Sequence, residues 1–110
     1  MSGAALTPAG ALAWLASLSV DLRATAVIGA DGACLAGDAQ LARRAAALLA
    51  AGATGPAGAA GAPATIEVRD GDLLAVRSDR HGVAAVLGPQ ALERLARADL
   101  RAALGALDGP

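Results

Sequence analysis

The sequence has no lysine, phenylalanine or tyrosine, and it contains one cysteine, one histidine and one tryptophan. A single cysteine excludes an internal disulfide and any metal site that needs several thiolates. A phosphate-binding P-loop ends in Gly-Lys followed by Ser or Thr, so the absence of lysine excludes that motif. We therefore expect neither a disulfide framework nor nucleotide binding through a P-loop.

Charge of either sign is also scarce, with nine arginines and ten acidic residues giving a net charge of −1. Non-specific nucleic-acid binding needs a basic surface, so we expect no nucleic-acid partner. Residues 1–20 and 45–66 are uncharged. The first could pass for a secretory signal, but it lacks a basic start and Pro8 and Gly10 interrupt it. Glycine and proline crowd the second, whereas a membrane helix needs about 20 predominantly apolar residues. We expect no membrane insertion, and the lone cysteine fits a reducing cytoplasm.

Small apolar residues take the place of the missing aromatics. Hydrophobic residues make up 55% of the 110 residues, but many of them are alanine. A chain of this length forms a single domain, 1–110, and an alanine-rich core buries little area per residue, so dimerisation is expected to add stability. Residues 1–7 and 108–110 are expected to be loose ends, and the glycine- and proline-rich residues 52–63 a flexible loop.

A predicted β-hairpin at residues 24–36 organises the chain. Asp31-Gly32 favours a two-residue type I′ turn, in which both residues have positive φ. Val27 and Ile28 are adjacent and therefore point to opposite faces of the sheet, although both are apolar. We expect the hairpin to lie in the middle of a sheet whose two faces are both covered.

The first predicted helix runs from about residue 8 to residue 20. Thr7 as N-cap with Pro8 at the first helical position is typical of a helix start. The apolar residues that share one side at the helical period are Ala11, Trp14, Leu15, Leu18 and Leu22. Trp14, the largest apolar side chain, is expected to anchor the core.

A second helix is predicted to begin at about Ala39, with Asp38 as a suitable N-cap. Its apolar stripe consists of Leu41, Ala45, Leu48 and Leu49. Arg43 lies opposite that stripe and Arg44 at its edge. The two arginines form either a solvated face or an anchor for an acidic partner surface, and the sequence leaves both interpretations open.

Three strands separated by short turns follow at about residues 65–69, 73–77 and 83–87, which predicts an antiparallel meander. A last helix is predicted between residues 89 and 107. Asp99 lies on the apolar face of that helix, unless the helix breaks and Asp99 caps a second segment.

No group of residues indicates catalysis. His81 is predicted to lie in a turn, with no second metal ligand and no nucleophile. Cys34 is expected to be a buried structural thiol, and the aspartates are explained by turns and helix caps. We therefore expect that the protein is not an enzyme and that it has no metal or cofactor site.

The order helix, two strands, helix, three strands, helix resembles the Roadblock/LC7 family. The resemblance covers about residues 8–107. It rests on a leucine-rich first helix, on Ala-Val-Ile-Gly-Ala-Asp-Gly-Ala-Cys-Leu-Ala at residues 26–36, and on the three later strands. It implies an α/β (α+β) three-layer sandwich around an antiparallel sheet, with the first and last helices on one face and the second helix on the other.

Roadblock/LC7 members act as adaptors or regulators of small Ras-like GTPases, and they typically dimerise through the third strand and the second helix. The resemblance therefore implies a cytoplasmic homodimer with a small-GTPase partner, and the composition, typical of a bacterium, favours this role over that of a dynein light chain. The residues implied at the interface are Leu41, Arg43, Arg44, Leu48, Ile66, Glu67, Val68 and Arg69. A small-molecule sensory domain and a structural scaffold are the alternatives. A sensor needs an enclosed pocket, whereas the alanine-rich faces predict close packing.

Overall fold

The computed structural model describes residues 7–18, 21–52 and 66–109, so most of the predicted loop at residues 52–63 lies outside the described residues. The described elements follow the predicted order. They are α1 (Pro8–Leu18), β1 (Leu22–Gly29), β2 (Cys34–Gly37), α2 (Ala39–Gly52), β3 (Ile66–Asp70), β4 (Leu73–Arg77), β5 (His81–Leu87) and α3 (Glu93–Asp108).

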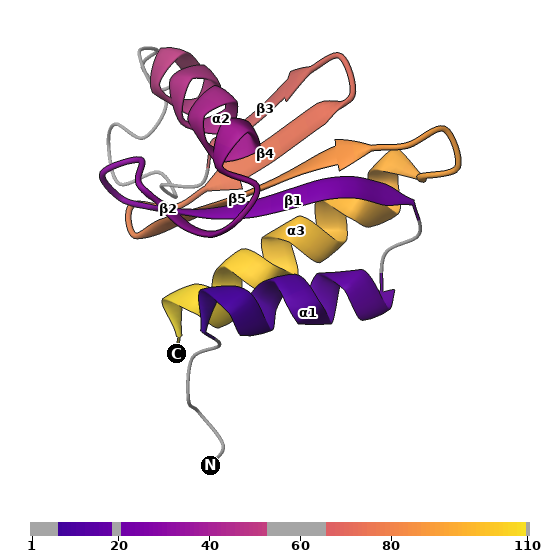
Figure 1. The fold of residues 1–110 in the computed structure, drawn as a ribbon, viewed down its shortest axis with the longest axis horizontal. Helices are drawn as coiled ribbons and strands as arrows, with labels where there is room; N and C mark the ends of the chain where they lie inside the picture. The colour runs from indigo at the N-terminus through magenta and orange to yellow at the C-terminus, as the bar shows by residue number, and fades with distance from the viewer. Residues whose placement is uncertain (1–6, 19–20, 53–65, 110) are drawn as a thin grey trace.

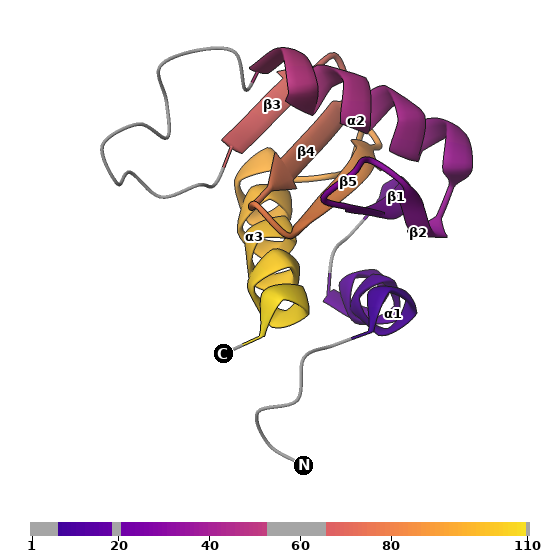
Figure 2. The same ribbon diagram turned by 90° about the vertical axis from the view of Figure 1, so that its left-hand side faces the viewer.

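The five strands form one antiparallel sheet in the order β2-β1-β5-β4-β3. Helices α1 and α3 cover one face of this sheet, and α2 covers the other (Figures 1 and 2). The predicted three-layer α+β architecture is therefore confirmed. The expected central place of the hairpin is wrong, because β5 inserts between β1 and β4 and leaves β2 at the edge of the sheet.

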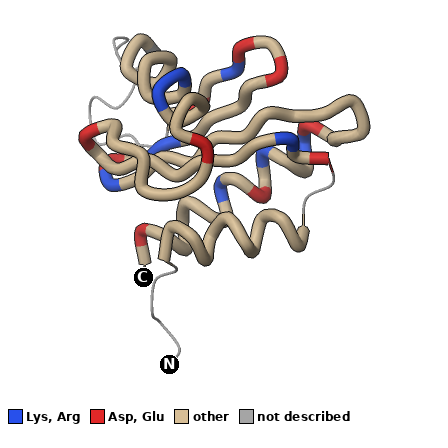
Figure 3. Tube along the Cα trace, viewed as in Figure 1, with Lys and Arg blue, Asp and Glu red and all other residues tan. Residues whose placement is uncertain are grey.

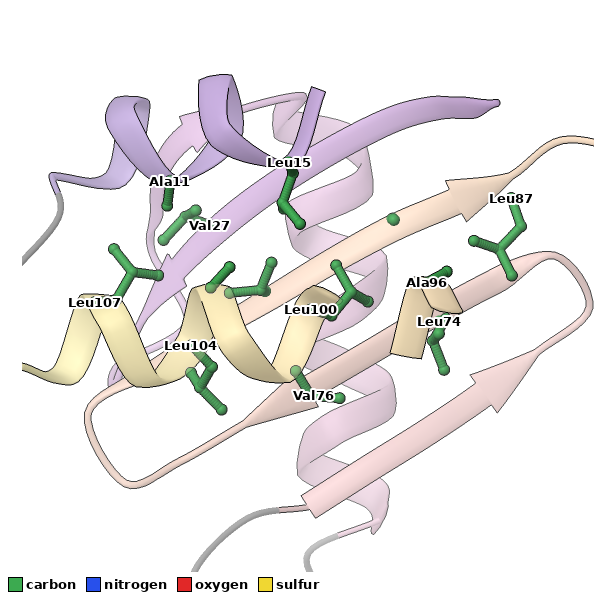
Figure 4. Packing of buried hydrophobic residues seen from close by; sticks show 13 residues of the cluster. Ala11, Leu15, Val27, Leu74, Val76, Leu87, Ala96, Leu100, Leu104 and Leu107 are labelled. Carbon is green, nitrogen blue, oxygen red and sulfur yellow. The ribbon is translucent and has the colours of Figure 1, made fainter. Parts of the chain in front are cut away.

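Two hydrophobic clusters fill the spaces between the sheet and its helices. Val27 belongs to the cluster under α1 and α3, whereas its neighbour Ile28 belongs to the cluster under α2. The same alternation separates Leu74 from Leu73 on β4. Figure 4 shows side chains of α1 and α3 meeting those of the strands in the first cluster. The prediction that both faces of the sheet are covered is confirmed.

The β1–β2 turn is longer than the sequence predicts. Residues 30–33 separate the strands, and Gly32 is the residue of the turn with positive φ, at 86°. The Gly29 N–H donates to the Ala33 carbonyl at 2.9 Å, and the Ala33 N–H donates to Asp31 Oδ1 at 3.0 Å. A type I′ turn needs positive φ at both central residues, so that prediction is wrong.

The ends of two helices differ from their predictions. Helix α3 begins at Glu93 rather than at Pro89, because the preceding backbone turns towards β1 and the Gln90 N–H donates to Asp21 Oδ2 at 2.8 Å. It then continues without a break past Asp99 to its last residue. In α1, the described helix ends at Leu18, which is 49% exposed rather than part of the buried stripe.

Three single residues test the expectations for the core and the C-terminus. Trp14 packs, half-buried, against the cluster under α1 and α3. Cys34 is exposed rather than buried, because the short strand β2 has no strand on its outer side. Asp108, expected in a loose tail, ends α3, and its carbonyl oxygen accepts a hydrogen bond from Arg80 Nη1 at 2.9 Å.

Gly37 should be intolerant of a side chain. Its φ is +89°, and an added Cβ would overlap the Thr25 carbonyl oxygen and approach Ala26 Cα to 2.8 Å. We expect Gly37→Ala to lower the free energy of unfolding by about 2–4 kcal/mol, since it combines left-handed strain with overpacking. Urea denaturation followed by circular dichroism measures this.

Gly105→Ala is the matched control, because Gly105 lies within α3 and an added Cβ would meet no atom within 4 Å. We expect it to raise the free energy of unfolding by about 0.5–1 kcal/mol. Equal effects of the two substitutions would contradict the described geometry at Gly37.

Candidate functional site

The residues implied at the interface lie on two neighbouring elements, α2 and β3. Strand β3 pairs with β4 alone and is therefore an edge of the sheet. An edge strand presents backbone N–H and C=O groups that a further strand can pair with. Helix α2 runs over the adjacent face of the sheet (Figure 2). We call the outer surface of α2, together with the free edge of β3, the α2–β3 surface.

The side chains of β3 divide between the two faces of the sheet. Ile66 and Val68 pack, half-buried, against the hydrophobic cluster under α2. Glu67 and Arg69 lie on the other face, where both form ion pairs with residues of α3. A partner at this edge would therefore meet an apolar side and a charged side of the same strand.

Five charged residues link β3 to α3, and we call them the β3–α3 ladder. They are Glu67 and Arg69 on β3 with Glu93, Arg97 and Arg101 on α3. Arg101 Nη2 is 2.8 Å from Glu67 Oε1, and Arg97 Nη2 is 2.7 Å from Glu93 Oε2. The Arg97 guanidinium also contacts the Glu67 carboxylate, and the Arg69 guanidinium contacts that of Glu93. Both carboxylates are thus shared between two arginines.

The β3–α3 ladder attaches the edge strand β3 to α3. The other face of β3 packs against the hydrophobic cluster under α2. Arg69 is fixed further because its Nε donates to the Gly71 carbonyl at 2.7 Å. Exposed ion pairs contribute little singly, about 0–1 kcal/mol, but this network also fixes the orientation of the β3 side chains. The charges of Glu67 and Arg69 are consequently engaged within one chain.

The acidity of Glu93 is changed by the ladder. The hydrogen bond from Arg69, together with the charges of Arg69 and Arg97, holds the pKa of the Glu93 carboxyl below its ordinary value. Removal from water acts on the pKa in the opposite direction and does not overcome these effects. Glu93 therefore remains ionised to lower pH in the folded chain than in the unfolded chain.

The outer surface of α2 carries the two implied arginines. Arg43 and Arg44 are both exposed; Arg44 Nη2 lies 4.0 Å from Asp70 Oδ2, a long and exposed pair. Arg43 has no acidic partner within the described residues. Leu41 is 4% exposed and belongs to the core rather than to the outer surface, and Leu48 is half-buried at its fringe.

The rest of the outer surface of α2 is small and uncharged. Ala47, Ala50 and Ala51 are exposed beyond the two arginines. Methyl groups allow another backbone or helix to approach closely. The N-terminal half of this surface is therefore basic, and the C-terminal half offers a flat contact.

Charge is distributed unevenly over the described molecule. Helix α1 has no charged residue, as Figure 3 shows, whereas charges gather on α2, on the β3–β4 hairpin and on α3. His81 forms a contact between β5 and the end of α3, in which its Nδ1 lies 2.8 Å from Asp108 Oδ1. No group of three or more potential metal ligands occurs among the described residues, and none of the described helices is long and apolar enough to cross a membrane.

The sequence did not reveal the α3 members of the ladder as partners of β3. Glu93, Arg97 and Arg101 follow one another at four-residue spacing, which predicts pairing along one helix. Pairing with Glu67, which is 34 residues before Arg101, depends on how α3 lies across the sheet. Helical spacing therefore places these three residues on one side of α3 but does not show that they pair with β3.

The lowered pKa of Glu93 leads to a pH-dependent stability difference. Since the folded pKa lies below the unfolded value, the ionised group stabilises the fold above the unfolded pKa, and this stabilisation is lost as pH falls through the folded pKa. We expect Glu93→Gln to be less stable than the wild type at pH 7, with the difference shrinking as the pH falls below the ordinary carboxyl pKa. Urea denaturation across that range measures it, and a pH-independent difference would contradict the ladder.

The fold has counterparts among solved structures. No family model matches the sequence, and no curated protein matches it. A Roadblock/LC7 domain from Streptomyces avermitilis superposes with a TM-score of 0.62 at 14% identity, covering 84% of this chain and 87% of that one. MglC from Myxococcus xanthus superposes with a TM-score of 0.59 at 15% identity, covering 90% of this chain and 94% of that one. The chain therefore has the Roadblock/LC7 fold that its sequence resembles.

Proposed function

We propose that this chain is a cytoplasmic, non-enzymatic adaptor or regulator of a small Ras-like GTPase and that it works as a homodimer. The fold supports this, because Roadblock/LC7 domains are typically non-catalytic regulatory domains. The observation that carries the proposal is the α2–β3 surface, where a free strand edge lies beside an exposed helix face.

The dimer forms when the β3 edges of two copies pair and continue the sheet from one chain into the other. Such an interface is isologous, so the α2 helices also meet, and the exposed Ala47 and Ala51 let them approach. The half-buried Ile66 and Val68 gain cover on the α2 side of the joined sheet. This adds buried apolar area to a small, alanine-rich core.

The GTPase partner contacts the basic part of the α2–β3 surface. Arg43 has no acidic partner among the described residues, and Arg44 has a distant one, so both can pair with carboxylates of another protein. Charge complementarity of this kind favours encounter and orientation. Arginine forms two parallel hydrogen bonds to a carboxylate, which makes the contact directional.

Dimerisation can be tested by light scattering coupled to size-exclusion chromatography. We expect the wild type to have twice the 10.5 kDa mass of one chain. Ala47→Arg on α2 and Ile66→Asp on β3 should each shift the mass towards that of one chain, since charge replaces an apolar contact. Far-UV circular dichroism establishes that each variant is folded.

Ala13→Arg is the matched control, because Ala13 is exposed on α1, on the other face of the sheet. Its mass should equal that of the wild type. A folded Ala47→Arg variant and a folded Ile66→Asp variant that both remain dimeric would refute this interface.

Partner binding can be tested by a pull-down with the small GTPases encoded in the source genome. We expect the wild type to retain one of them and to alter its hydrolysis rate. The double variant Arg43→Glu/Arg44→Glu should weaken binding about tenfold or more, which corresponds to the loss of one or two charge-assisted contacts. Arg94→Glu, an exposed arginine on α3, serves as the control. Retention of no GTPase by the wild type would contradict the proposal.

A further inference from the structure

A cavity of about 150 Å³ lies on the α2 side of the sheet, contrary to the close packing expected from the sequence. The β1–β2 turn, the adjoining ends of β4 and β5, and the second half of α2 line it. Small residues of α2 explain why it stays open, because Ala46 and Ala50 supply only methyl groups.

Arg77 is the arginine that lines the cavity. It ends β4, and Leu73 and Ala75 at alternate positions of the same strand belong to the cluster under α2, so Arg77 lies on that face. Its side chain is half-buried, and its Nε donates to the Ser78 carbonyl at 3.1 Å. Within the described residues no carboxylate forms an ion pair with its guanidinium.

The other charged or ionisable residues of the lining are already engaged. Asp31 Oδ1 accepts the Ala33 N–H within the turn at 3.0 Å. His81 pairs with Asp108 of α3, which packs on the opposite face of the sheet. A partly buried guanidinium without a carboxylate is costly, whereas an anionic ligand would offset that cost through two parallel hydrogen bonds.

We propose that this cavity binds a small monocarboxylate with a short apolar tail. The carboxylate pairs with Arg77, and the tail contacts Ile28, Ala46 and Leu49. A cavity of about 150 Å³ holds a ligand the size of benzene, about six non-hydrogen atoms. A singly charged ligand fits better than a phosphate dianion, because Asp31 brings negative charge to the same lining.

This site is separate from the two arginines proposed to contact the GTPase, although its lining residue Ala50 also lies on the outer surface of α2. None of the residues that line the cavity belongs to β3, and neither Arg43 nor Arg44 is among them. The failure of either proposal therefore leaves the other standing. Ligand binding is an additional property of the α2 side of the sheet.

The test is a nuclear magnetic resonance titration of the full chain with butyrate, compared with butyramide and butylammonium. We expect butyrate to cause saturable shifts of the amides of Gly29, Gly32 and Gly82, which line the cavity. Butyramide keeps the tail and removes the charge, so its affinity should be at least about tenfold lower than that of butyrate. Butylammonium reverses the charge and should cause no saturable shift.

Arg77→Gln should reduce butyrate affinity about tenfold or more, whereas Arg43→Gln, a matched arginine outside the cavity, should leave it unchanged. No saturable butyrate shift, equal affinity for butyramide, or full affinity in Arg77→Gln would each overturn the proposal. The comparison of the three probes uses the wild type alone, so it decides the question even if Arg77→Gln does not fold.

Discussion

The structure depends on one constraint, a sheet that is apolar on both faces. Adjacent residues of β1 and β4 enter different hydrophobic clusters, so neither face can be left to water. Helices must therefore cover both sides, and within the described residues the two edge strands, β2 and β3, are where the sheet is left open. The three layers, the exposed outer surface of α2 and the free edge of β3 all follow from this requirement.

Small side chains determine how closely the layers and strands of the molecule pack. With no phenylalanine or tyrosine, the layers pack through leucine, valine and alanine, and strands approach closely where glycine permits it. Gly37 shows the benefit, since no side chain fits between it and the Thr25 carbonyl. The cavity beside Arg77 shows the opposite effect, because the alanines of α2 leave space that a larger residue would fill.

The sequence predicted the features that depend on local pattern. Alternation and helical periodicity located the helices and strands of the described residues, and Asp38 caps α2 as expected, with Oδ1 accepting the Leu41 N–H at 3.0 Å. Features that depend on three-dimensional placement were not accessible. Strand order, which moved the hairpin to an edge and exposed Cys34, is not encoded in hairpin chemistry. The partners of Glu67 and the isolation of Arg77 likewise depend on elements that are distant in sequence. Arg77 does, however, end an otherwise apolar strand at a core-facing position, which is a usable signal.

The charges of β3 also specify how two such strands can align. In an antiparallel pair related by a two-fold axis at Val68, Glu67 of one copy stands opposite Arg69 of the other. A shift that moves the axis to Glu67 or to Arg69 keeps the faces matched but sets identical charges against each other. The β3–α3 ladder fixes these side chains on one face, so it maintains the pattern that distinguishes the registers. In the proposed dimer, the residues that secure the edge of one chain would thus also discriminate between correct and slipped pairing with a second.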